Sequence, residues 1–185
     1  MKYLNHLLDK ALVSHSHLAH QYQKIASLYI KKKTFKKALD FTKKALDSHH
    51  KKFETEYRFD HWEFIDGELK PLSENIKELF YTNSGKKRSV VVGYGLCILN
   101  HARCLSIQKK YEEANKMIDK ACKYYYVFPK LNHLSQLEKG INLFYNKSKI
   151  GLEKIDKELK NLDQFENFTK SETRIIKKAK RLIKK

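Results

Sequence analysis

The sequence predicts an all-α protein in which pairs of helices stack into an α-α superhelix that ends in a C-terminal capping helix. Three observations support this prediction. Apolar residues recur at helical spacings of three and four through most of the chain. Only 6 Gly and 2 Pro among 185 residues leave little turn chemistry for an all-β fold. Alanines also return at fixed offsets, which indicates repeated close crossings of helices.

The first complete helix pair is expected over residues 18–50. The break between its two helices falls at Lys31–Lys33, and Thr34 is a suitable N-cap for the second helix. Ala38 and Ala45 follow Ala26 by 12 and 19 residues, and these small side chains let the helices approach closely. The apolar faces consist of Tyr22, Ile25, Ala26 and Tyr29 in the first helix and Phe35, Ala38, Leu39, Phe41, Ala45 and Leu46 in the second.

The same offsets return twice further along the chain. Ala102 lies two periods of 38 residues after Ala26, and Ala114 and Ala121 follow it by 12 and 19, which predicts a helix pair over residues 89–125. One further period leads to Gly140. At the same two offsets stand Leu152 and Leu159, so a degenerate pair is expected over residues 131–163.

The period between these pairs, residues 52–83, matches poorly. We expect a helix over about Lys52–Phe64, a turn, and a second helix over about Leu72–Tyr81; a β excursion at Trp62–Leu69 is the alternative. The β-branched run Ser89–Val92 favours a strand by propensity. The helical period from Tyr94 to Gln108 favours a helix start there instead, and we adopt the helix.

Both ends of the chain are expected to be single helices within one domain spanning residues 1–185. Residues 1–13 resemble the second helix of an earlier pair, so they form either an unusual cap or the remnant of a longer protein. Thr169 and Glu172 have the spacing of a capping box before a basic capping helix over residues 169–185. The polar face of that helix carries Arg174, Lys177, Lys178, Lys180, Arg181, Lys184 and Lys185.

The small-residue offsets and the string KKYEEANKMIDKA resemble the tetratricopeptide repeat. Thr42 replaces the usual aromatic, and His50 stands where proline is frequent. The 38-residue period and the Lys-, Asn- and Tyr-rich composition are similar to the repeat domains of Rap-type regulators and related peptide-pheromone receptors of low-G·C Gram-positive bacteria and their phages. This resemblance implies an intracellular receptor whose groove binds a short peptide, with its effector segment supplied from elsewhere.

The resemblance also implies a ligand groove on the concave wall, formed by the first helix of each pair. Its polar and basic side chains could hold an extended peptide by its backbone, with Arg58 or Arg103 binding a carboxylate. The alternative is that these are ordinary solvated helix residues. The groove positions are His20, Gln23, Ser27, Lys31, Arg58, His61, Asn100, Arg103, Ser106, Asn142 and Tyr145.

The net charge of +18 suggests an anionic partner, so nucleic-acid binding is the second hypothesis after a peptide or protein partner. Lysine greatly outnumbers arginine, which equally fits a solvated Lys-rich surface. Cys97 and Cys104 lie seven residues apart on one helical face, which predicts buried thiols in a reducing, cytoplasmic setting. No signal peptide or membrane span is expected.

No enzyme, cofactor or metal site is predicted. Phosphate-loop and nucleophile-elbow motifs are absent, and the glycines of Val91–Gly95 lack the Lys–Ser/Thr pair of a phosphate loop. His15, His17 and His20, with His49 and His50, have no metal-ligand spacing. The oligomeric state is not set by these patterns.

Overall fold

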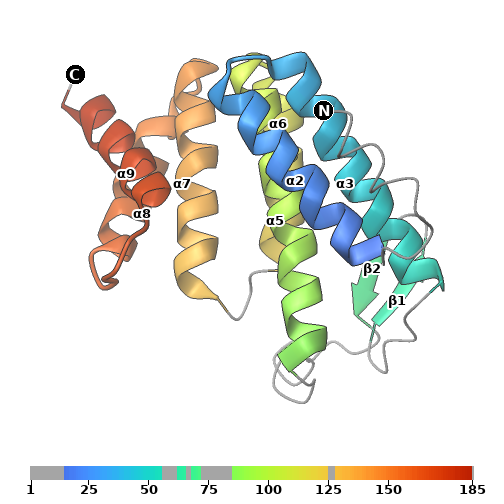
Figure 1. Ribbon diagram of the computed structural model, residues 1–185. Coiled ribbons are helices and arrows are strands. Elements are labelled where there is room, and N and C mark those ends of the chain that lie inside the picture. Colours follow the sequence, from blue (N-terminus) through green and yellow to red (C-terminus); the bar gives the residue numbers. More distant parts are fainter. Residues whose placement is uncertain (1–14, 56–61, 66–67, 72–84, 125–127, 185) are drawn as a thin grey trace. The chain divides into compact units, whose positions relative to one another are not determined.

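The computed structural model describes residues 15–55, 62–65, 68–71, 85–124 and 128–184 (Figure 1). Within these ranges the fold is predominantly helical, which confirms the all-α prediction in its coarse form. The chain divides into two compact units, unit 1 (Met1–Asn100) and unit 2 (His101–Lys185), and the division falls inside helix α5. The expected single domain over residues 1–185 stays a prediction.

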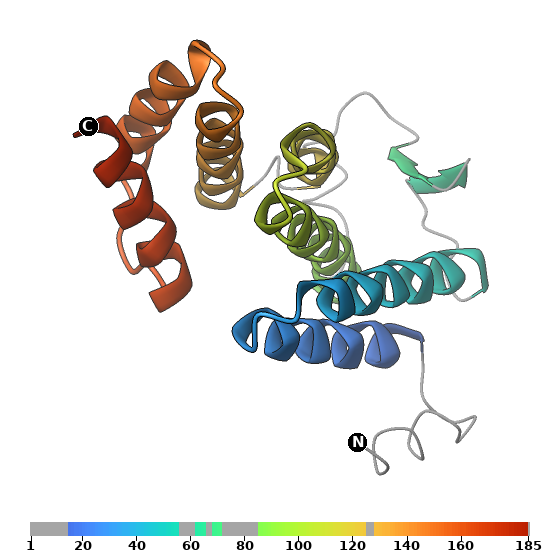
Figure 2. The ribbon, with the colours of Figure 1, turned by 90° about the horizontal axis from the view of Figure 1, so that it is seen from above.

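Unit 1 is organised around the antiparallel pair of helices α2 and α3, which lie side by side along most of their length (Figure 2). Ala19, Ala26, Ala38 and Ala45 are all buried, so side chains no larger than a methyl group occupy the crossing. Phe41 fills the remaining space, with its ring stacked on Tyr29 at 5.5 Å between centroids. The elements of this unit are α2 (His15–Lys31), α3 (Phe35–Thr55), β1 (Trp62–Ile65), β2 (Glu68–Pro71) and the first part of α5 (Gly85–Ile107).

A two-stranded antiparallel hairpin replaces part of the helix expected over Lys52–Phe64. Helix α3 runs on to Thr55, but Trp62–Ile65 is a strand paired with Glu68–Pro71, and Ile65 stands opposite Glu68. The helical prediction was therefore wrong at its C-terminal end, and the alternative β excursion was correct. Two strand-forming segments joined by an Asp-Gly dipeptide are a strong hairpin signal, and this sequence has Asp66-Gly67 between them.

Two further predictions for unit 1 have different outcomes. The region Ser89–Val92 lies inside helix α5, so the choice of helix over strand is confirmed. The helices expected over residues 1–13 and Leu72–Tyr81 lie outside the described residues.

Unit 2 consists of the end of α5 followed by four helices that pack on one another in sequence order. Its core is formed by Leu134, Leu137 and Ile141 of α7 with Ile155 and Leu162 of α8. The elements are α6 (Tyr111–Lys123), α7 (Pro129–Tyr145), α8 (Ile150–Leu162) and α9 (Lys170–Ile183).

The capping box that precedes α9 is confirmed. The hydroxyl of Thr169 accepts the N–H of Glu172, and the Glu172 carboxylate accepts the N–H of Thr169 at 2.6 Å. Lys130 reinforces the same turn because its ammonium donates to the carbonyl of Asn167 at 3.0 Å. The apolar face of α9 buries Ala179 and Leu182 against α7 and α8.

Helices α7 and α8 approach each other so closely at Gly140 and Gly151 that a side chain at either position would collide with the other helix. A Cβ added at Gly151 would lie 2.5 Å from the Phe144 nitrogen, and one at Gly140 would lie 3.0 Å from the Ile155 side chain. Leu152, which stands at the same offset as the buried Ala38 and Ala114, is 43% exposed. The connection before α8 is one residue longer than in the two earlier helix pairs, so α8 begins in a different phase and turns Gly151 inward.

Three interhelical turns share one hydrogen-bond geometry. Each has a lysine in the left-handed conformation, with φ of 58° at Lys33, 63° at Lys109 and 58° at Lys147, spaced by 76 and 38 residues. Each forms a Schellman motif, in which the next residue's N–H reaches a carbonyl five residues back. These bonds are Thr34 to Tyr29 (2.9 Å), Lys110 to Leu105 (3.0 Å) and Ser148 to Leu143 (2.9 Å). Glycine is the usual residue here, because the left-handed conformation costs other residues roughly 1–2 kcal/mol.

Substitution of Gly151 by alanine tests the tight crossing. We expect Gly151→Ala to lower the free energy of unfolding by about 1–3 kcal/mol, because the new methyl group overlaps the backbone of Phe144. The matched control is Gly93→Ala, whose Cβ meets only the His49 ring at 3.9 Å and gains up to about 1 kcal/mol of helix propensity. Urea unfolding followed by circular dichroism measures both variants, and equal midpoints would contradict the crossing.

Candidate functional site

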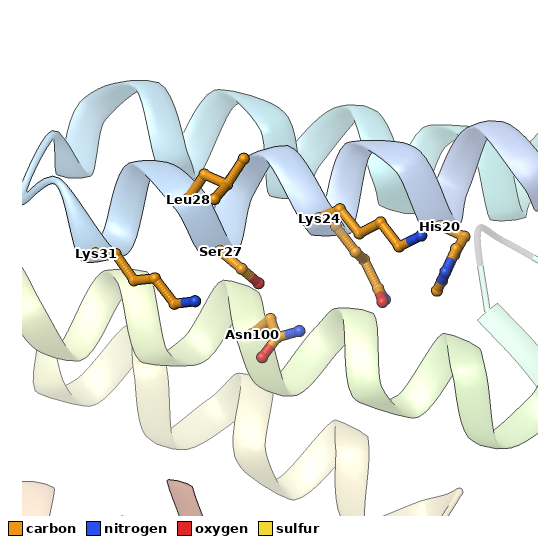
Figure 3. Close-up of a pocket in the computed structure, with 7 residues that line it drawn as sticks. His20, Lys24, Ser27, Leu28, Lys31 and Asn100 are labelled. Carbon is orange, nitrogen blue, oxygen red and sulfur yellow. The ribbon is translucent and has the colours of Figure 1, made fainter.

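A hollow of about 410 Å³ lies between α2 and α5 in unit 1. Figure 3 shows His20, Ser27 and Lys31 extending from α2 toward α5, and Asn100 extending from α5 toward α2. Five of the eleven predicted groove residues thus come together around one hollow, four on α2 and Asn100 on α5, all within a single unit. The complete lining is His20, Gln23, Lys24, Ser27, Leu28, Lys31 and Asn100.

The helical period of α2 accounts for this grouping. His20, Lys24, Ser27 and Lys31 follow one another at intervals of four, three and four, so they share one helical face. Ala19 and Ala26 lie on another face and are buried at the crossing with α3. Close packing on one side of α2 therefore fixes which side chains face the hollow.

Gln23 connects the two walls of the hollow. Its side-chain amide donates to the sulfur of Cys97 and lies 3.5 Å from the carbonyl oxygen of Gly93, both on α5. The Gln23 side-chain amide is therefore bound within the protein. They leave His20, Lys24 and Lys31, which are all exposed, as the groups best placed to meet a ligand.

Lys24 and Leu28 are hollow residues that the sequence prediction missed. Lys24 stands one helical turn after His20, and Leu28 stands one turn after Lys24. The helical period could therefore have predicted that both residues lie beside His20 on the same face. Leu28 is 55% exposed, which is high for a large apolar side chain. The hollow therefore combines two ammonium groups and an imidazole with uncharged hydrogen-bonding groups and one exposed apolar side chain.

The predicted groove residues of unit 2 have other roles. The Arg103 guanidinium forms a bidentate pair with Glu138, with Nη2–Oε1 at 2.6 Å and Nε–Oε2 at 2.9 Å. Its assignment to a ligand carboxylate is corrected, because a carboxylate of the protein already occupies it. The hydroxyl of Ser106 donates to the Ala102 carbonyl at 3.0 Å within α5.

Asn142 and Tyr145 also differ from the prediction. Asn142 is buried, and its amide donates to the Asn115 side-chain oxygen at 3.1 Å, so it joins α6 to α7 rather than facing a ligand. Tyr145 is 42% exposed and stacks on Tyr111 with 6.1 Å between ring centroids. Arg58 and His61 lie outside the described residues.

All three cysteines are free thiols, and Cys97 and Cys104 are buried, as predicted. Burial raises the pKa of Cys97 to about 12, against a smaller opposing effect of the Gln23 hydrogen bond. It raises the pKa of Cys104 and of Cys122 to about 11. Since the thiolate is the reactive form, these sulfurs are poor nucleophiles near neutral pH.

The part of the chain that the structure describes, residues 15–55, 62–65, 68–71, 85–124 and 128–184, holds neither a metal cluster nor a membrane span. There, no three His, Cys, Asp or Glu side chains come together as a metal site. No helix in those ranges is long and apolar enough to cross a membrane. Comparison with known proteins finds no matching family, curated relative or solved structure.

The role assigned to Arg103 gives a stability prediction. We expect Arg103→Met to lower the free energy of unfolding by about 1–2 kcal/mol, because it leaves the carboxylate of Glu138, only 13% exposed, without its guanidinium partner. The double variant Arg103→Met/Glu138→Leu should recover most of this loss, which unfolding by urea would show. Additive effects of the two substitutions would contradict the pairing.

The raised thiol pKa values predict slow labelling. At about pH 8, Cys97 holds roughly a thousandfold less thiolate than a thiol with the ordinary pKa of 9.0, because burial penalises the charged form. We expect a disulfide reagent to modify it far more slowly than free cysteine, and all three thiols to react at once in concentrated guanidinium chloride. Site-resolved mass spectrometry gives the rates, and native labelling of Cys97 at the free-cysteine rate would refute its burial.

Proposed function

We propose that this chain is a non-enzymatic, helical-repeat binding protein that takes a peptide or an extended protein segment in the α2–α5 hollow. The observation that carries the proposal is the convergence of His20, Ser27, Lys31 and Asn100 around one cavity. These four residues are among those that the sequence predicts to face a ligand groove. The carboxylate-binding role shifts from arginine to Lys24 and Lys31, which lie on the same face.

The chemistry of the hollow favours an acidic peptide. Lys24 and Lys31 supply two ammonium groups about two helical turns apart, and His20 adds a third nitrogen group at one end. Ser27 and Asn100 offer a hydroxyl and an amide, which suit the N–H and C=O groups of an extended backbone. Exposed Leu28 supplies an apolar contact at the edge.

The size of the hollow limits its occupant. A volume of about 410 Å³ falls near the lower end of the roughly 300–1,000 Å³ typical of small-ligand pockets. It accommodates a few side chains of a peptide rather than the surface of a folded domain. A short acidic segment with one apolar residue fits both this volume and the groups that line it.

The repeat architecture is part of the same proposal. Identical Schellman turns at Lys33, Lys109 and Lys147, spaced by 76 and 38 residues, support helix pairs derived from one repeating unit. A superhelix of tetratricopeptide type, and a place as a regulator or regulator fragment in a bacterial signalling pathway, follow from the resemblance of the sequence. The peptide-receptor function would then be exercised through a partner or a further segment.

Selection from a peptide library tests the proposal. We expect seven-residue peptides with free carboxyl termini that bind the protein to be enriched in Asp and Glu beside one large apolar residue. Substitution Lys24→Glu/Lys31→Glu should weaken the best peptide at least tenfold in fluorescence anisotropy, because it replaces two attractive charges with repulsive ones.

The matched control is Lys36→Glu/Lys43→Glu, which changes the same net charge at exposed positions of α3 outside the hollow. This control should retain affinity within a factor of about three. Equal weakening by both double variants, or a library without acidic enrichment, would exclude the hollow as the binding site. Circular dichroism of each variant checks that the helices are intact.

A further inference from the structure

One end of unit 2 gathers lysines and tyrosines from two separate turns. The rings of Tyr111, at the start of α6, and Tyr145, at the end of α7, stack at 6.1 Å with 18° between their planes. This contact brings the α5–α6 turn and the α7–α8 turn to the same end of the unit (Figure 1). We call this surface the turn edge; it comprises Lys109, Lys110, Tyr145, Lys147, Lys149 and Lys178.

Two of these lysines occupy a conformation that normally favours glycine. Lys109 and Lys147 have φ of 63° and 58°, at equivalent positions of the two turns. This is the C′ position of the Schellman turns described above, which glycine usually occupies. Both residues are exposed, so each turn presents a positive charge to solvent.

Lys178 extends the turn edge from helix α9. Its ammonium lies 4.8 Å from the centre of the Tyr145 ring. Burial lowers the pKa of Lys178, and the nearby Glu138 carboxylate partly opposes that shift. Glu138 already binds Arg103 in two places, so this carboxylate is shared between two cations.

The first turns of α6 and α8 add the acidic side chains Glu112, Glu113 and Glu153 to this end of the unit. Glu113 pairs with Lys110 at 3.2 Å, and Glu112 is exposed beside it at the start of α6. Lys109, Lys147 and Lys149 are exposed. The surface therefore has an excess of positive charge next to an aromatic ring that is 42% exposed.

We propose that the turn edge binds single-stranded nucleic acid through its phosphate backbone, with a base taking the place of the Lys178 ammonium on the Tyr145 ring. Proteins that bind single strands without sequence preference combine a basic track with exposed aromatic rings, and both are present here. Lysine serves such contacts well because a point charge suffices for phosphate, whereas base recognition favours the arginine fork. This inference does not depend on what occupies the α2–α5 hollow.

Fluorescence anisotropy with a labelled oligothymidylate, measured over a range of salt concentrations, tests the proposal on the full chain. We expect binding whose affinity falls steeply with salt. Substitution Lys109→Glu/Lys147→Glu should weaken binding at least tenfold and reduce the salt slope by about 1.4, since each lost single-strand phosphate contact removes about 0.7. Tyr145→Leu should weaken binding about tenfold through the lost stacking.

The control is Lys116→Glu/Lys157→Glu, which makes the same charge change at exposed positions within α6 and α8. It should keep the wild-type salt slope. Equal losses in both double variants would show that only the net charge attracts the strand and would overturn the proposal. Absence of binding at low salt, or equally effective competition by polyglutamate, would overturn it as well.

Discussion

The close approach of paired helices is the constraint on which the rest of the structure depends. In unit 1 the crossing is made by buried alanines, and in unit 2 by Gly140 and Gly151, where even a methyl group has little or no room. Such contacts fix the rotation of each helix about its axis, because only one face carries side chains small enough to fit. Once Ala19 and Ala26 face α3, the orientation of every other residue of α2 follows. The polar wall of the hollow is thus a consequence of the crossing.

Much of the helical fold could be predicted, because small residues at fixed offsets report directly on these crossings. The prediction failed where local chemistry departs from the repeat. The segment Trp62–Ile65 satisfies helical spacing, but β-forming residues followed by Asp66-Gly67 favour a hairpin. Leu152 stands at the offset of the buried alanines yet is exposed, because the preceding connection is one residue longer than the earlier ones and turns Gly151 inward instead. Leu159, at the second offset, is buried.

The candidate site was predictable only in part, for a related reason. A helical period shows which residues share a face, and so the hollow residues of α2 were found together. It does not show which distant side chain will meet that face. Arg103 is paired with Glu138, 35 residues away, and Asn142 is paired with Asn115, 27 residues away. These partners depend on how helices stack, which no local pattern contains.

In this architecture the buried side chains that stabilise the fold are largely different from the charged side chains on its surface. A net charge of +18 makes the compact state repel itself, yet the buried contacts of both units are made largely by uncharged side chains. The Arg103–Glu138 pair is partly buried, whereas the lysines of the hollow and of the turn edge are exposed. Replacing exposed lysines by acidic residues therefore reduces self-repulsion without removing a core contact. For this reason, a loss of binding in such variants reports on the surface itself, and the two proposed surfaces can be examined one at a time in a folded protein.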